Sequence, residues 1–137
     1  MLMKTRIILL LLAFWGCSPS EKNENSAEAS EIVDLDAKGF KESIDATPDA
    51  VVLDVRTPGE VEDGAIPGAV NIDYNAPDFS DKISTLDKTK PYYVYCMGGG
   101  RSSKALDKMK AEGFTNVYNL EGGFKAWVKN GFETTKE

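Results

Sequence analysis

The pattern of apolar and polar positions changes at residue 31, after which short β-like runs alternate with helical ones. Five runs rich in β-favouring residues predict strands, and they cover residues 32–35, 50–55, 66–72, 91–95 and 117–120. The second run is almost unbroken in its apolar character, as expected for a strand covered on both faces. Because strands alternate with helices, we expect an α/β domain with a five-stranded, mainly parallel sheet flanked by helices.

The segments between these runs carry helix signals. Asp36 is placed to cap a first helix, in which Phe40 and Ile44 lie four positions apart. Thr57 and Glu60 match a capping box at the start of a second helix. Three further helical patterns follow, and they cover residues 79–86, 102–112 and 124–130.

The connection from the fourth run into the next helix has the composition of a reactive loop. Residues 95–102 are Tyr-Cys-Met-Gly-Gly-Gly-Arg-Ser. Three consecutive glycines let several backbone N–H groups point inward, and the helix start adds its positive dipole end. Such surroundings lower the pKa of a cysteine, whose thiolate is the nucleophilic form. A buried structural cysteine is the alternative, and the glycines with Arg101 favour a reactive Cys96.

The carboxyl ends of parallel strands meet at one edge of a sheet, where ligands of open α/β sheets bind. Arg56 follows the second predicted strand and Cys96 follows the fourth. We therefore expect both residues at this edge, with Arg56 and Arg101 as two cations near one thiol.

The composition excludes several classes of function. The chain has 137 residues, which suits one domain, and it contains no histidine. Mechanisms that use imidazole as a base or metal ligand are therefore excluded, and we expect no metal and no other cofactor. The net charge of −6 argues against nucleic acid as a partner, because a phosphate backbone demands clustered Lys and Arg.

The first residues have the pattern of a targeting segment. Lys4 and Arg6 precede an apolar run over residues 7–15, which is too short to span a bilayer. Followed by Gly16 and Cys17, this pattern resembles a bacterial lipoprotein signal peptide. The resemblance implies cleavage before Cys17, lipidation of that cysteine, and a membrane-anchored protein of the bacterial cell envelope, facing the periplasm or the cell surface. An ordinary signal peptide cut nearby and an uncleaved anchor are the alternatives.

The chain accordingly divides into four parts. Residues 18–30 are rich in Ser, Asn, Glu and Ala and show no hydrophobic period, so they are not expected to fold alone. The predicted parts are a signal peptide over 1–16, a lipidated Cys17 with a disordered tether over 17–30, a domain over 31–133 and a tail over 134–137.

Three separated segments of the domain resemble the rhodanese family of thiosulfate sulfurtransferases. They are residues 53–72, with Asp54, Arg56 and Glu60, then residues 95–102, and finally residues 120–127. Their order and spacing are specific, and the likeness extends over roughly residues 31–132. The resemblance implies a five-stranded parallel sheet with the cysteine loop as the active site.

In that family, the cysteine takes a sulfane sulfur from a donor such as thiosulfate, holds it as a persulfide and passes it to a thiophilic acceptor. Cys96 matches this nucleophile, and Arg101 matches the loop arginine that would hold the donor anion. Loop N–H groups would stabilise thiolate and persulfide without a proton relay. The substrate-binding residues implied are Met97, Gly98, Gly99, Gly100, Arg101 and Ser102, with Asp54 and Arg56 in support.

Arg56 has two interpretations. It lies at the rim of the site, or it pairs with Asp54 or Glu60 to brace the loop; the second is favoured because Arg is the usual fixed partner of carboxylates. Gly122 and Gly123 are expected to serve packing. The chain departs from many members at Ala65 and Val61, where His and an aromatic residue are common, and its uncharged residues 97–100 imply modest affinity for thiosulfate.

Two other functions are alternatives to sulfur transfer. A related Cys-dependent phosphatase has five residues between Cys and Arg, whereas here there are only residues 97–100, a smaller cradle that suits sulfur better than phosphate. A non-catalytic binding module is disfavoured because Cys96 is retained with its loop. With Cys17 lipidated or removed, Cys96 is the only thiol, so the sulfur acceptor is expected to be external: cyanide, a small thiol or a protein.

Overall fold

One five-stranded sheet lies at the centre of the computed structural model, which describes residues 32–136. The strand order is β1-β5-β4-β2-β3, and each neighbouring pair runs parallel. The strands are β1 (Val33–Leu35), β2 (Val51–Asp54), β3 (Val70–Asn71), β4 (Tyr92–Tyr95) and β5 (Val117–Leu120). The predicted five-stranded α/β fold is confirmed, with pairing that is parallel throughout the described residues.

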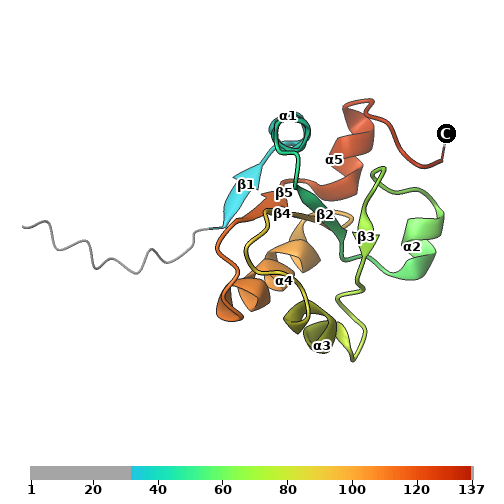
Figure 1. Cartoon of the computed structure of the whole chain (residues 1–137). Coiled ribbons are helices and arrows are strands. Elements are labelled where there is room, and N and C mark those ends of the chain that lie inside the picture. Colours follow the sequence, from blue (N-terminus) through green and yellow to red (C-terminus); the bar gives the residue numbers. More distant parts are fainter. Residues whose placement is uncertain (1–31, 137) are drawn as a thin grey trace, which may run out of the picture.

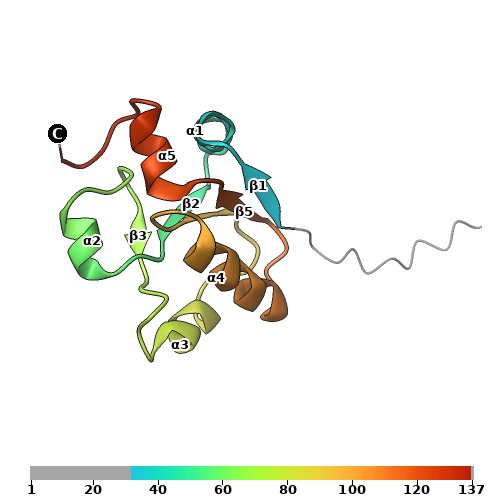
Figure 2. The same cartoon turned by 180° about the vertical axis from the view of Figure 1, so that it is seen from behind.

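Helices cover both faces of this sheet (Figure 1 and Figure 2). They are α1 (Ala37–Ala46), α2 (Pro58–Glu62), α3 (Phe79–Ser84), α4 (Gly100–Ala111) and α5 (Gly123–Lys129). Helices α1 and α5 pack on one face, α3 and α4 pack on the other, and α2 lies beside β3. Within the described residues, no helix has the length and apolar character required to cross a membrane.

Alternation along β4 divides the core into two clusters. Tyr92 and Val94 pack with the residues of α3 and α4, and Cys96, which continues this alternation, belongs to the same cluster. Tyr93 and Tyr95 point to the opposite face, where they pack with α1 and α5. The direction of the strand therefore aims the Cys96 thiol at the α4 side of the sheet.

The helix starts follow local sequence signals. The Asp36 carboxylate accepts a hydrogen bond of 2.7 Å from the Gly39 N–H, and the capping box of Thr57 and Glu60 is present, so both predicted caps are confirmed. Helix α4 begins earlier than predicted, inside the glycine run. Gly99 precedes it with a φ of +108°, a conformation that turns the chain from β4 directly into the helix.

Some boundaries differ from the prediction. The third predicted strand contributes only Val70–Asn71 to the sheet, because the residues before it form a turn. Residues 134–137 were predicted to form a tail, yet Thr135 exchanges two hydrogen bonds of 2.9 Å with Ala65. The predicted signal peptide, Cys17 and the tether lie outside the described residues.

Candidate active site

Cys96 lies at the carboxyl end of β4, where the strand turns into the glycine loop. Its side chain is 2 % exposed. The Gly99 N–H donates a hydrogen bond of 3.0 Å to the Sγ atom, and the Ser102 hydroxyl lies 3.4 Å from it. The glycine run thus folds back over the thiol, as the sequence predicted for an anion-stabilising loop.

The surroundings of the thiol favour its ionised form. Burial by itself raises the pKa of Cys96, but hydrogen bonds from the Ser102 side chain and from the N–H groups of Ser102, Gly99 and Gly98 outweigh it, and the pKa lies below its ordinary value. Each of these donors is a fixed dipole. The loop therefore stabilises a sulfur anion without an ionised partner in contact with it.

The Ser102 hydroxyl serves two acceptors with one proton. It lies 3.0 Å from the Gly99 carbonyl oxygen and 3.4 Å from the Cys96 sulfur, and the side chain is fully buried. When the thiol ionises, the sulfur becomes the stronger acceptor. Ser102 therefore both binds the Gly99 carbonyl in the turn before α4 and stabilises the thiolate.

The start of α5 fixes the other side of the loop. The N–H groups of Phe124 and Lys125 donate to the carbonyl oxygens of Cys96 and Met97, at 2.8 and 3.2 Å. A Cβ atom on Gly123 would lie 2.6 and 2.5 Å from those two oxygens. The carbonyl groups of the loop are bound by α5, and the N–H groups of the loop remain available to the thiol.

Arg101, the cation of the loop, is paired with a carboxylate. Its Nη1 and Nη2 atoms donate hydrogen bonds of 2.7 Å to Oε2 and Oε1 of Glu60. The bond from Arg101, helped by the backbone and side chain of Thr57, lowers the pKa of Glu60 to about 2, against the effect of burial. Glu60 at the start of α2 therefore engages the guanidinium that the sequence assigns to the donor anion.

Arg56 is buried and braces the edge of the sheet. Its Nη2 atom donates to Oδ2 of Asp54 at 2.7 Å and to the Gly64 carbonyl at 2.8 Å. The guanidinium lies 4.2 Å from the centroid of the Phe124 ring. The favoured pairing of Arg56 with Asp54 is confirmed, so this guanidinium braces the edge of the sheet.

Tyr95 joins that pair to the strand of the nucleophile. Its hydroxyl donates to Oδ2 of Asp54 at 2.6 Å and accepts from the Ile66 N–H at 3.0 Å. Burial and the Asp54 carboxylate raise the pKa of Tyr95, so its hydroxyl stays protonated and serves as a donor. The residue before Cys96 is thereby fixed from the opposite face of the sheet.

Sequence reasoning missed the role of Glu60 in the site. It assigned this residue to the capping box, in which Oε2 accepts from the Thr57 N–H at 2.9 Å, and considered it as a partner of Arg56 but not of Arg101. A capping carboxylate has spare acceptor capacity, and α2 begins at the sheet edge that carries Cys96. Those two signals together would have indicated Arg101 as its partner.

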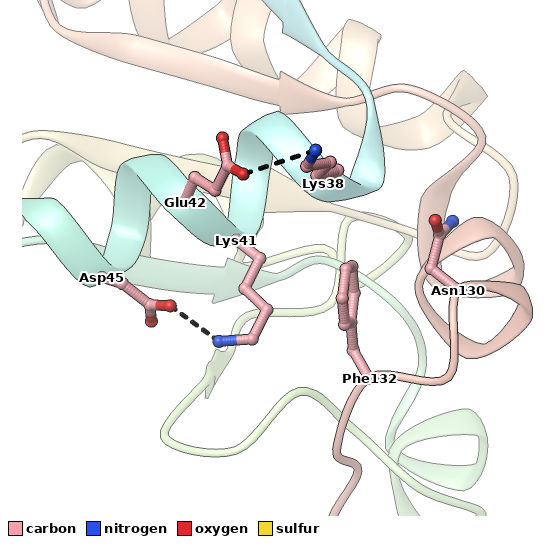
Figure 3. Close-up of a pocket in the computed structure, with 6 residues that line it drawn as sticks. All are labelled: Lys38, Lys41, Glu42, Asp45, Asn130 and Phe132. Atoms are coloured by element: carbon pink, nitrogen blue, oxygen red, sulfur yellow. Dashed lines mark hydrogen bonds and ion pairs between the residues drawn. The ribbon is translucent and has the colours of Figure 1, made fainter.

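A hollow of about 410 Å³ lies away from the thiol, between α1 and the segment after α5 (Figure 3). Its lining includes the ion pairs Lys38–Glu42 and Lys41–Asp45, and Figure 3 shows the Phe132 ring facing Lys41. Because α1 packs on the opposite face from α4, this hollow does not contain the nucleophile. Within residues 32–136, no cluster of three His, Cys, Asp or Glu side chains is arranged to hold a metal ion.

Comparisons with known proteins agree with this architecture. The chain is 39% identical over 92 residues to thiosulfate sulfurtransferase 16 of Arabidopsis thaliana, which covers 60% of this chain and 77% of that protein. It is 30% identical over 98 residues to a sulfurtransferase of Allochromatium vinosum, with 72% and 90% covered. The crystal structure of a rhodanese-related protein from Thermoplasma volcanium superposes with a TM-score of 0.67 and 30% identity, covering 77% of this chain and 99% of that one.

The family model points in the same direction. Residues 36–130 match the model of the rhodanese-like domain, a range that begins at the cap of α1 and ends just after α5. It therefore contains the whole sheet except β1, together with the Cys96 loop. The chain belongs to the rhodanese-like domain family.

Proposed function

We propose that this protein is a sulfurtransferase that carries a sulfane sulfur on Cys96. The observation that supports this best is the loop itself, in which the Gly99 N–H lies 3.0 Å from the Cys96 sulfur and the combined donors lower the thiol pKa. A lowered pKa increases the thiolate fraction of Cys96 at a given pH without a neighbouring base. Relatives named sulfurtransferases and the family membership support the same reaction class.

The reaction proceeds in two displacements. The Cys96 thiolate attacks the outer sulfur of thiosulfate, the S–S bond of the donor breaks, and sulfite leaves with the electron pair. A nucleophilic acceptor then attacks the outer sulfur of the persulfide, and the Cys96 thiolate leaves. The loop N–H groups stabilise the anion before and after each step, because both thiolate and persulfide carry one negative charge.

The acceptor in this proposal is external. The chain has two cysteines, and Cys96 is the free cysteine among the described residues. Once Cys17 is lipidated or removed, no second thiol of the chain can discharge the persulfide. Cyanide, a small thiol or a partner protein would then take the sulfur.

Mass spectrometry of the purified protein after thiosulfate treatment tests the proposal. The wild-type protein should gain one sulfur atom on Cys96 and lose it on addition of cyanide, which forms thiocyanate. A Cys17→Ala variant should behave in the same way, and a Cys96→Ser variant should gain nothing. Absence of the gain in the wild type, or its persistence in Cys96→Ser, contradicts sulfur transfer through this residue.

We also propose that Cys17 carries a lipid that anchors the protein in the bacterial cell envelope. The basic start, short apolar run and Gly16-Cys17 pair of the sequence support this proposal. Growth with a labelled fatty-acid analogue should mark the wild type and the Cys96→Ser variant but not the Cys17→Ala variant. Label retained in Cys17→Ala contradicts lipidation at this position.

A further inference from the structure

The pair of Arg101 and Glu60 determines what charge the active-site loop presents to a donor. Both guanidinium Nη atoms are engaged at 2.7 Å with the two carboxylate oxygens. The two side chains are 26% and 27% exposed, so the pair lies at the surface of the site and is not sealed within it. An anionic donor that approaches the loop therefore meets a cation that already has a partner.

Glu60 is fixed in this position by its own helix. Its Oε2 atom accepts from the Thr57 N–H at 2.9 Å and from the Thr57 hydroxyl at 3.0 Å. An anion that takes its place on Arg101 would have to break two charge-assisted bonds, while the carboxylate stays close by. Glu60 therefore competes with the donor anion for the Arg101 guanidinium.

The charges around Arg101 add to this effect. Besides Glu60, the carboxylate of Asp73 and the Cys96 thiolate act on Arg101 through their charge. The positive charge of Arg101 is therefore partly offset by Glu60 and Asp73, and by Cys96 when it is ionised, before any donor arrives. A donor with two negative charges meets more repulsion here than a donor with one.

We infer that Glu60 is a specificity-determining residue that selects against doubly charged sulfur donors in favour of singly charged ones. This inference rests on the proposed function and narrows its donor class. The preferred donor is then one in which the transferable sulfur is bonded to a leaving group of low charge. Thiosulfate, a dianion, is a usable but poor substrate.

Two donors of matched chemistry isolate the charge. Thiosulfate and methanethiosulfonate both present a terminal sulfane sulfur on a sulfonyl centre, but a methyl group replaces one charged oxygen in the second. In each case the Cys96 thiolate attacks the terminal sulfur and the S–S bond of the donor breaks. The electron pair leaves with sulfite from thiosulfate or with methanesulfinate from methanethiosulfonate.

The experiment measures kcat/KM for both donors, with cyanide as acceptor, in the wild type and in Glu60→Gln. Glutamine preserves a capping box, so the helix start is retained. Freeing Arg101 should raise kcat/KM about tenfold for thiosulfate and about threefold for methanethiosulfonate, since electrostatic energy scales with donor charge, with the gain mainly in KM. Glu62→Gln, an exposed residue at the end of α2, is the matched control and should change neither value.

The double variant Glu60→Gln/Arg101→Gln gives a second readout. In this variant, the ratio of kcat/KM for thiosulfate to kcat/KM for methanethiosulfonate should return to the wild-type value, because the freed Arg101 that binds thiosulfate is absent. A donor ratio that stays unchanged in Glu60→Gln, or a changed ratio that persists in the double variant, overturns the role of Glu60 while leaving the proposed sulfur transfer intact. If the wild type takes sulfur from neither donor, the proposed function fails and the inference fails with it.

Discussion

Cys96 depends on its own loop for the stabilisation of its thiolate. The nearest donors to its sulfur are the Gly99 N–H and the Ser102 hydroxyl, at 3.0 and 3.4 Å. A neighbouring cation would lose strength with salt, whereas short contacts to dipoles are not screened in this way. The stabilisation of the Cys96 thiolate by these dipoles should therefore depend little on ionic strength.

Replacing Ser102 by alanine tests this account. The variant should raise the pKa of Cys96 toward its ordinary value, because it removes a hydrogen bond that stabilises the thiolate and leaves the burial in place. The rate of alkylation by iodoacetamide, followed against pH, should show its inflection at higher pH than in the wild type.

Ser103→Ala is the matched control for this measurement. The Ser103 hydroxyl donates to the same Gly99 carbonyl at 3.0 Å but takes no part in the chemistry proposed above. Its alkylation profile should coincide with that of the wild type. Equal shifts in both variants would mean that the loop, and not the Ser102 hydroxyl, had changed.

Glu60 should also contribute to stability in a manner that depends on pH. Its pKa is about 2 in the folded protein, against an ordinary value of 4.5. A lowered carboxyl pKa gives stability that is present above pH 4.5 and is lost as the pH falls through about 2. Because the pair is partly exposed, Glu60→Gln should lower the free energy of unfolding by about 1–2 kcal/mol at pH 7.

Urea unfolding at pH 7, pH 4 and pH 2.5 measures the effect. The difference between wild type and Glu60→Gln should shrink as the pH falls, and Glu62→Gln should show no such trend. A difference that stays constant down to low pH would indicate that packing, and not the charge of Glu60, is responsible.

At the scale of elements, α5 clamps the loop that β4 and α4 share. Gly123 has a φ of +61° and its missing side chain lets α5 approach the Cys96 and Met97 carbonyl groups. Gly123→Ala should therefore cost about 3 kcal/mol or more, and it should reduce sulfur uptake, because the carbonyl groups must move.

Gly131→Ala distinguishes the cost of a positive φ at alanine from the cost of a steric clash of the Cβ atom. Gly131 has a similar φ of +73°, but a Cβ atom there would meet nothing within 4 Å. Its cost should be about 1 kcal/mol, with sulfur uptake unchanged. Thermal unfolding and the one-sulfur mass gain of both variants measure the two effects, and equal losses would show that the clamp is not needed.

The elements also show what could be predicted from the sequence. The caps at Asp36 and Thr57 were predictable because each joins residues three apart, and β4 was predictable from its β-favouring run. The bridge from Arg101 to Glu60 joins residues 41 apart, and the bond from Tyr95 to Asp54 also spans 41. Such contacts depend on which strands become neighbours, and local pattern does not determine strand order.

At the scale of the whole molecule, the site is complete within the described residues. The nucleophile follows β4, its helix is α4, its clamp is α5, and Glu60 comes from α2, all between residues 51 and 129. Both core clusters are likewise built from residues 32–132. The contacts that shape the site therefore come from these described elements.

A chain that begins at residue 31 tests whether these elements suffice. It should unfold with the same midpoint as the full chain and should gain one sulfur on Cys96 with the same kcat/KM, because the site and both core clusters are built from residues 32–132. The same shortened chain with Cys96→Ser is the control and should gain none. A shortened chain that folds but takes up no sulfur would contradict the division of the protein into parts.

The ends of the sheet carry a separate consequence, for aggregation. Strands β1 and β3 lie at its two edges, and they are three and two residues long. Exposed edges can recruit strands of other chains, and very short edge strands offer few backbone groups for such pairing. The longer strands β2, β4 and β5 are paired on both sides within the sheet, so they have no free edge for another chain. We therefore expect copies of this protein to resist edge-to-edge aggregation even when they are crowded together.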